Sequence, residues 1–234
     1  DINDFVAGFS ILLKPNGVAT FEFPHLLKLV NENQFDTIYH EHFSYLSLTA
    51  LEVIFKENGL QIFDVEEHTT HGGSLRLFAQ RSDTGVQTVS EQVIKLRKRE
   101  IDVGMGSDNF YKNFQEKANI VKDDLLNFLI KAKQDGKKVV AYGAAAKGNT
   151  LLNYAGVRPD LLSYVVDKSP SKQGKYMPGS RIPIYTEQFL KDDKPDYVLI
   201  LPWNLKNEVV KQLSYIQENI GKFVVAVPNL KVIK

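Results

Sequence analysis

Apolar and polar positions in the first third of the chain predict a mixture of helices and strands. Apolar residues recur at helical spacing over residues 5–13, a Pro-Asn-Gly break follows, and "VATFEF" (18–23) is β-rich. Residues 47–58 again have helical spacing, begin with a Ser or Thr N-cap and stop at Gly59. We therefore expect the order helix, strand, helix.

The next residues predict a hairpin and then a helical connector. Residues 60–67 and 74–81 alternate well enough to be two strands around "HTTHGG". Residues 82–135 are charged and periodic in long stretches, which indicates helices that end near Gly136.

The last hundred residues alternate buried strands with helices. Strands are expected at 137–142, 161–167, 196–202 and 222–228, with helices after "GAAAKG", at "TEQFLKD" and over 205–218. Continuous apolar strands joined by helices are typical of a doubly wound parallel sheet covered on both faces. The predicted fold class is α/β.

Composition narrows the function classes. The 234 residues are 43% hydrophobic, carry a net charge of +1 and include no cysteine. These values give no reason to expect nucleic acid or a membrane as partner, and they exclude disulfides and thiolate metal sites. We expect a cytoplasmic protein. Because helical spacing starts almost at Asp1, without a methionine, we also expect a fragment.

All five histidines lie in the first third, and "YHEH" (39–42) is the strongest candidate for proton chemistry, since histidine titrates near neutral pH. A helical turn would put Tyr39 and His42 on one face, whereas an extended segment would pair Tyr39 with Glu41 and His40 with His42. A polar loop whose histidines only bond the backbone is an equal alternative. A metal site is disfavoured, because "HEH" and "HTTH" match no standard ligand spacing.

Two glycine segments could approach a ligand. In "HGGSLR", Gly72 and Gly73 form either a hairpin turn with positive φ or a close backbone approach, with Ser74 and Arg76 as polar contacts. Both interpretations stay open.

The second segment, "GAAAKGNT" (143–150), follows a strand and opens a helix, so its N–H groups could hold a phosphate. It is not a Walker A loop, because an asparagine stands where the lysine should be. Ligands of open α/β sheets bind beyond the carboxyl ends of strands, and further polar loops converge there. The candidates for a nucleotide site are Gly143, Lys147, Gly148, Asn149, Asp167, Trp203 and Asn204.

Several motifs together resemble a known family. "LLKPNGVATFEFP" is similar to the late helix, turn and strand of class I S-adenosylmethionine-dependent methyltransferases. "EFPHLLKLVNENQFDTIYHEHFSYLS", "THGGSLR", "YGAAAKGNTLLNY", "VVDKSPSKQGKYMPGSRIPI" and "LILPWN", in that order, resemble the C-methyltransferases of nucleotide-linked keto-deoxysugars over nearly the whole chain.

The resemblance implies a domain plan. Residues 1–81 would be the second half of the methyltransferase domain, 82–135 a helical connector, and 136–234 a Rossmann-like domain that binds the nucleotide sugar. The family's zinc belongs to an N-terminal module absent from this chain, so no metal ligand is assigned. Most of the S-adenosylmethionine site would also be missing, with Glu22 as the one residue near the donor. The chain as supplied would be inactive.

The resemblance also implies the chemistry. His42 would remove a proton next to the sugar's ketone, and the enolate would attack the sulfonium methyl group. Tyr39 and Glu41 would orient His42 or bind the sugar, with His40 as a less defined partner. The substrate's diphosphate, most often on thymidine, would lie near Lys147 and Asn149. We expect His42 to face the same cleft as this phosphate-binding edge.

Two other classes compete with this interpretation. A non-catalytic nucleotide or nucleotide-sugar binding module would keep the last domain but would not need "YHEH". A metal-dependent hydrolase would use the histidine cluster. The oligomeric state, the sugar and the stereochemistry are not predicted.

Overall fold

The computed structural model describes residues 1–233 and divides into two compact units. Unit 1 comprises Asp1–Asn31 and Phe43–Phe114, and unit 2 comprises Glu32–His42 and Gln115–Lys234. The predicted three-part plan is arranged differently, because the connector is shared between the units and the "YHEH" segment belongs to unit 2. The units are described one at a time.

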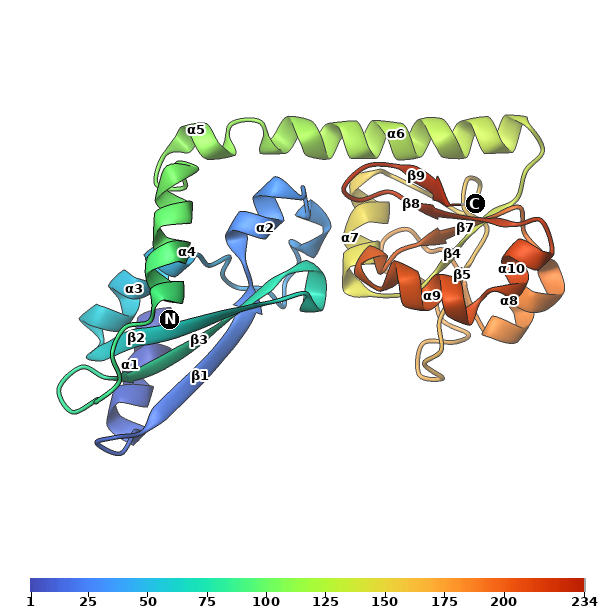
Figure 1. Cartoon of the computed structure of the whole chain (residues 1–234). Coiled ribbons are helices and arrows are strands. Elements are labelled where there is room, and N and C mark those ends of the chain that lie inside the picture. Colours follow the sequence, from blue (N-terminus) through green and yellow to red (C-terminus); the bar gives the residue numbers. More distant parts are fainter. Residues whose placement is uncertain (234) are drawn as a thin grey trace. The chain divides into compact units, whose positions relative to one another are not determined.

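Unit 1 is a three-stranded antiparallel sheet with helices. Its strands β1 (Val18–Pro24), β2 (Leu60–His68) and β3 (Ser74–Arg81) have the order β1-β3-β2 (Figure 1). The 60–67 and 74–81 hairpin is therefore confirmed. The helical elements are α1 (Ile2–Leu12), α2 (Leu26–Asn31), α3 (Leu48–Glu57), η2 (Thr70–Gly72), α4 (Glu91–Asp102) and α5 (Asp108–Tyr111).

The core of unit 1 lies on one face of this sheet. Alternate residues of β2 and β3, such as Ile62 and Leu77, belong to one buried cluster with Phe55 of α3 and Leu96 of α4. The predicted start of α3 is confirmed, because the Ser47 hydroxyl accepts a hydrogen bond from the Ala50 N–H at 3.2 Å. The opposite face carries charged side chains, among them Glu22, Glu66 and Arg76.

A buried carboxylate joins three parts of unit 1. Glu100 of α4 accepts hydrogen bonds from the N–H groups of Leu48 and Thr49 at 2.9 and 2.8 Å, and from the Thr49 hydroxyl. It also lies 2.8 Å from Nε2 of the buried His25, which follows β1. A carboxylate at the positive end of α3 is favourable electrostatically. These contacts hold the chain before and after residues 32–42, the segment that belongs to unit 2.

Unit 2 is built on a six-stranded sheet of order β6-β5-β4-β7-β8-β9 (Figure 1). Its strands are β4 (Val139–Tyr142), β5 (Val165–Val166), β6 (Ile184–Tyr185), β7 (Tyr197–Ile200), β8 (Lys222–Val225) and β9 (Lys231–Ile233). Its helical elements are η1 (Phe35–Thr37), α6 (Phe114–Gln134, in unit 2 from Gln115), α7 (Ala146–Tyr154), α8 (Glu187–Asp193), η3 (Trp203–Leu205), α9 (Lys206–Gln212) and α10 (Tyr215–Glu218).

The strand order confirms the predicted α/β class. All pairs from β6 to β8 are parallel, and only β9 is antiparallel. The chain winds outward from β4 to β6, then returns to β7 beside β4, so the winding direction reverses at the carboxyl ends of β4 and β7. Ligands of such sheets bind at this reversal.

Some predicted boundaries in unit 2 are wrong. Of the strand expected at 161–167, only the two residues of β5 form a strand. The helix expected over 205–218 is divided into η3, α9 and α10. β6 and β9 were not predicted. Both lie at sheet edges, where short ladders leave little hydrophobic pattern in the sequence.

Candidate functional site

The "YHEH" segment forms a turn in unit 2. The His42 N–H donates to the Tyr39 carbonyl at 2.9 Å, which closes the turn over three residues. The two rings lie against each other, with centroids 4.2 Å apart and planes tilted by 35°. The structure therefore adopts the pairing expected for a helical turn, and Tyr39 and His42 lie on one face.

A backbone carbonyl orients His42. Nδ1 of its ring lies 2.8 Å from the Thr37 carbonyl oxygen. Because a carbonyl can only accept, Nδ1 carries the hydrogen, and the lone pair of the neutral ring is on Nε2. In this tautomer Nε2 is the ring atom that can accept a proton. Thr37 was not identified in the sequence, and Glu41, expected to orient the base, is exposed.

A cavity of about 370 Å³ in unit 2 contains part of this turn. Its lining combines Tyr39 and His40 with the loop after β4, the start of α7 and the segment Ser171–Pro178 that follows β5. His42 is half-buried and is not among the lining residues; its ring reaches the cavity wall through Tyr39. The sequence led us to expect His42 itself in this cleft, but the residues of the turn that line the cavity are Tyr39 and His40.

The start of α7 gives the cavity a positive end. Ala144, Ala145, Ala146, Asn149 and Thr150 line it. The N-cap residue Ala145 has no side chain that could bond the first N–H groups of the helix. Free N–H groups and the helix dipole favour an anion at this position.

The two glycines of this loop serve close packing. Gly143 has φ +91°, and a Cβ there would lie 2.6 Å from Cδ of Pro202. A Cβ on Gly148 would lie 2.7 Å from Cβ of Leu201. The backbone therefore approaches the chain after β7, and neither glycine is needed at the cavity wall.

The segment after β5 contributes cations that sequence reasoning did not single out. Nζ of Lys172 donates to the Ala144 carbonyl at 2.8 Å, while Lys175 and Tyr176 are exposed at the cavity. Asp167, a predicted substrate ligand, instead accepts from the N–H groups of Ala144 and Ser169, each at 2.8 Å. Asp167 thus holds the two loops together. The signal in the sequence was three lysines in "DKSPSKQGK".

Lys147, Trp203 and Asn204 form a cluster of their own. Nζ of Lys147 donates to Oδ1 of Asn204 at 2.7 Å and lies 4.6 Å from the centroid of the Trp203 ring. The indole Nε1 donates to Oδ2 of Asp36 at 2.7 Å. None of these three predicted site residues lines the cavity, so the structure gives them different neighbours from those expected.

In unit 1, Glu22 is the centre of a polar cluster on the charged face of the sheet. One carboxylate oxygen accepts from the hydroxyls of Thr70 and Ser74 at 3.0 and 2.7 Å, and the other from Arg76 at 2.8 Å. The strand register places Glu22 and Arg76 directly opposite across β1 and β3. These hydrogen bonds, Ser74 first, lower the pKa of Glu22 to about 2.

The paired glycines form the turn before β3. Gly72 and Gly73 have φ of +92° and +118°, and a Cβ on Gly73 would lie 2.9 Å from Cγ of Lys28. The hairpin-turn interpretation is therefore confirmed. Ser74 and Arg76 bind Glu22, and a contact of this turn with a ligand stays a prediction.

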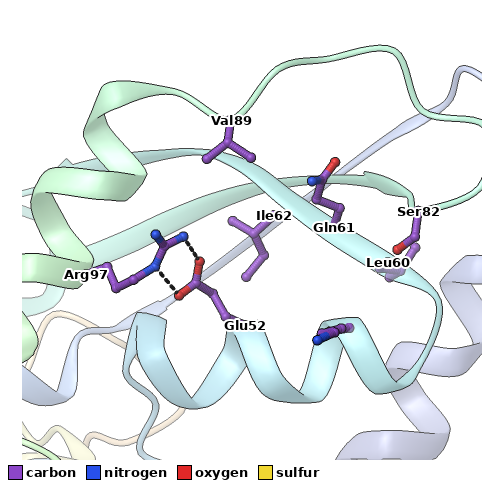
Figure 2. A pocket seen from close by; sticks show the side chains of 8 residues that line it. Glu52, Leu60, Gln61, Ile62, Ser82, Val89 and Arg97 are labelled. Atoms are coloured by element: carbon purple, nitrogen blue, oxygen red, sulfur yellow. Dashed lines mark hydrogen bonds and ion pairs between the residues drawn. The ribbon is translucent and has the colours of Figure 1, made fainter.

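A second cavity of about 370 Å³ lies in unit 1 between α3, β2 and α4. The Arg97 guanidinium donates two hydrogen bonds to the Glu52 carboxylate, of 2.8 and 2.5 Å. Figure 2 shows this pair with Ile62 next to it. The charges of Arg97 and Glu52 balance each other. Within residues 1–233 no three histidine or carboxylate side chains gather as metal ligands, and no helix is long and apolar enough to span a membrane.

The fold and the cavity define an α/β protein with a cavity beyond the carboxyl ends of β4 and β5 of a doubly wound sheet. Residues 69–228 match the family model described as "C-methyltransferase C-terminal domain". The C-methyltransferase NovU of Streptomyces niveus is 36% identical over 233 residues, which cover 100% of this chain and 55% of NovU. The chain therefore belongs to the C-methyltransferase family. It spans about half the length of this curated relative.

Proposed function

We propose that the protein takes part in C-methylation of a nucleotide-linked keto-sugar with S-adenosylmethionine as methyl donor. One observation carries this proposal: the cavity of unit 2 brings Tyr39 and His40 together with the start of α7 and with Lys172 and Lys175. Such a cavity can bind a diphosphate at one end and a sugar beside the turn that holds His42.

The nucleoside diphosphate would be bound by positive groups of unit 2. The N–H groups at the start of α7 and Nζ of Lys175 would face the phosphate oxygens, and Tyr176 offers a ring for the base. Lys172 is already bound to Ala144 and would contribute its charge. Thymidine diphosphate is the first probe to use.

The proton would be removed by His42. With Nδ1–H bound to the Thr37 carbonyl, Nε2 accepts the proton from the carbon next to the ketone, and an enolate forms. The phenol of Tyr39, in contact with this ring, would donate to the enolate oxygen. General-base catalysis of this kind typically accelerates a reaction roughly 10²–10⁴-fold.

The placement of Glu22 beside S-adenosylmethionine stays a prediction. Glu22, predicted to lie near the donor, has both carboxylate oxygens bound by Thr70, Ser74 and Arg76. The cavity beside it is lined mainly by apolar side chains, among them Phe5, Phe21 and Phe55. No step involving the donor is therefore assigned to residues of this chain.

Two measurements test the proposal. Thymidine diphosphate should raise the melting temperature of the chain, because a ligand at a hundred times its Kd adds about 2.7 kcal/mol to the stability. A thymidine diphosphate keto-sugar in D₂O should exchange the hydrogen next to its ketone, which reports the base without any methyl donor. Binding without exchange would favour the alternative, a nucleotide-sugar binding module. Failure of both would reject the site.

A further inference from the structure

A buried carboxyl group joins η1, the short helix before "YHEH", to η3 after β7. Asp36 in η1 has no exposed surface, and its Oδ2 accepts from Nε1 of Trp203 at 2.7 Å. Its Oδ1 is also buried and has no hydrogen-bond partner among the described residues. Burial of such an oxygen is costly, so the position of Asp36 requires support from its surroundings.

Lys147 supplies that support as a positive charge over the ring of the same indole. Its Nζ lies 4.6 Å from the ring centroid of Trp203 and is held by Oδ1 of Asn204 at 2.7 Å. An ammonium group over an indole face is attracted by the ring. It also favours the negative charge of Asp36, which is bound at the indole nitrogen. Three elements, η1, α7 and η3, therefore meet at one indole.

The segment has a second anchor next to the first. The ring of Phe35 lies 5.2 Å from the ring of Tyr154 at the end of α7. Residues 33–37 are all buried. The carbonyl of Thr37, one residue after Asp36, accepts the hydrogen bond from Nδ1 of His42. A shift of η1 would therefore move the group that sets the tautomer of His42.

We infer that Asp36, Trp203 and Lys147 are positioning residues that fix η1 against α7 and η3. The Thr37 carbonyl of η1 then holds His42 in its Nδ1–H form. The inference rests on the proposed function for its catalytic meaning. It gives Lys147 a different part from that of a phosphate ligand: the lysine acts on the indole, and Lys175 and the start of α7 serve the diphosphate.

The charge state of Asp36 supports this arrangement. Burial raises its pKa from 3.8 to about 6, against the opposing effects of the Trp203 hydrogen bond and of Lys147. Lys147 is the charged side chain that acts on it, and burial lowers the pKa of Lys147 in turn. A protonated Asp36 loses its attraction to Lys147 and weakens its acceptance from the indole.

The first experiment uses Trp203 as a probe, since it is the one tryptophan in the sequence. Its fluorescence in the wild-type protein should titrate with a midpoint near the pKa of about 6 given by burial of Asp36. Asp36→Asn should abolish that transition, and Asp135→Asn, an exposed carboxylate paired with Lys131, should leave it unchanged. An identical titration in Asp36→Asn would overturn the inference.

The second experiment reads the tautomer of His42 by ¹⁵N NMR of the imidazole nitrogens, which needs no activity. The wild type should show the Nδ1–H form, and Asp36→Asn and Lys147→Met should both shift it toward a mixture. An unchanged His42 signal in both variants would overturn the positioning role. A wild type that shows the expected tautomer yet never exchanges the sugar proton would instead reject the proposed function alone.

Kinetics separate positioning from phosphate binding. Asp36→Asn and Lys147→Met should lower kcat for proton exchange about ten- to hundredfold, as small misplacements of catalytic groups do, while KM and the Kd of thymidine diphosphate change less than about threefold. The double variant Asp36→Asn/Trp203→Phe should lose no more of kcat than the worse of its two single variants does. A tenfold weaker Kd in Lys147→Met with unchanged kcat would overturn the assignment of Lys147.

Discussion

The imidazole of His42 packs against the phenol ring of Tyr39, with ring centroids 4.2 Å apart. This contact joins a candidate base that does not line the cavity to a residue that does. It also keeps the phenol and the imidazole on one side of the turn, as the proposed proton transfer requires.

His42→Gln should abolish the exchange of the proton next to the ketone and leave nucleotide binding intact. Glutamine keeps a donor for the Thr37 carbonyl but has no group that accepts a proton near neutral pH. We expect exchange to fall at least about 10²-fold, the lower end of the effect of a general base. The measurement is loss of the proton signal in D₂O.

The matched control is His68→Gln in unit 1, where His68 lies 3.1 Å from Glu66 on the protein surface. This variant should exchange at the wild-type rate. Equal rates in His42→Gln and the wild type would remove His42 as the base.

Lys175→Met should weaken binding of thymidine diphosphate. Lys175 is exposed at the cavity, and a hydrogen bond to a charged group contributes about 1.5–3 kcal/mol, so Kd should rise about tenfold or more. Calorimetry at two salt concentrations should also show a smaller salt dependence in the variant, because one cation is missing.

Lys168→Met is the control for this charge, since Lys168 is exposed on the same segment but does not line the cavity. It should bind thymidine diphosphate as the wild type does. If both lysine variants lose the same affinity, the summed positive charge of the segment explains the binding, and no direct contact of Lys175 is required.

Much of the fold follows from patterns that are local in the sequence. The Ser47 cap, the stop at Gly59 and the hairpin of β2 and β3 were predicted because each depends on residues within a few positions. The contact of Asp36 with Trp203 joins residues 167 positions apart. No periodicity records such a pair, and neither residue shows from its neighbours that it is buried.

The candidate site was predictable in type more than in detail. The sequence identified the "YHEH" turn and the edge of the terminal sheet. It did not show that Lys147 would bind Asn204 or that Asp167 would bind the backbone, because lysine and aspartate in a loop have many alternatives. Lys175 would have been among the candidates if all three lysines of "DKSPSKQGK" had been considered.

Gly148→Ala should destabilise unit 2 although alanine favours helices. The substitution gains about 1 kcal/mol of helix propensity, but its Cβ would lie 2.7 Å from Cβ of Leu201, and overpacking typically costs about 1–3 kcal/mol. We expect a net loss of about 1 kcal/mol, measured by urea unfolding.

Gly106→Ala is the control, because a Cβ there has no heavy atom within 4 Å. Its unfolding midpoint should match that of the wild type or exceed it slightly. A Gly148→Ala variant as stable as the control would show that α7 can move away from the chain after β7.

Glu22→Gln should change the pH dependence of unfolding in a defined window. Because hydrogen bonds from Ser74, Arg76 and Thr70 lower the folded-state pKa of Glu22 from 4.5 to about 2, the carboxylate stabilises unit 1 above pH 4.5. This contribution is lost as the pH falls from 4.5 through about 2, where Glu22 becomes protonated in the folded state as well. Glutamine cannot titrate, so the two proteins should differ most near neutral pH and converge at the acid end. Urea unfolding of both proteins across this window checks the prediction, with the exposed Glu57→Gln as control. If the difference in unfolding free energy stays constant down to the acid end, the charge of Glu22 contributes nothing. The loss of stability in Glu22→Gln would then come from the shape of the amide.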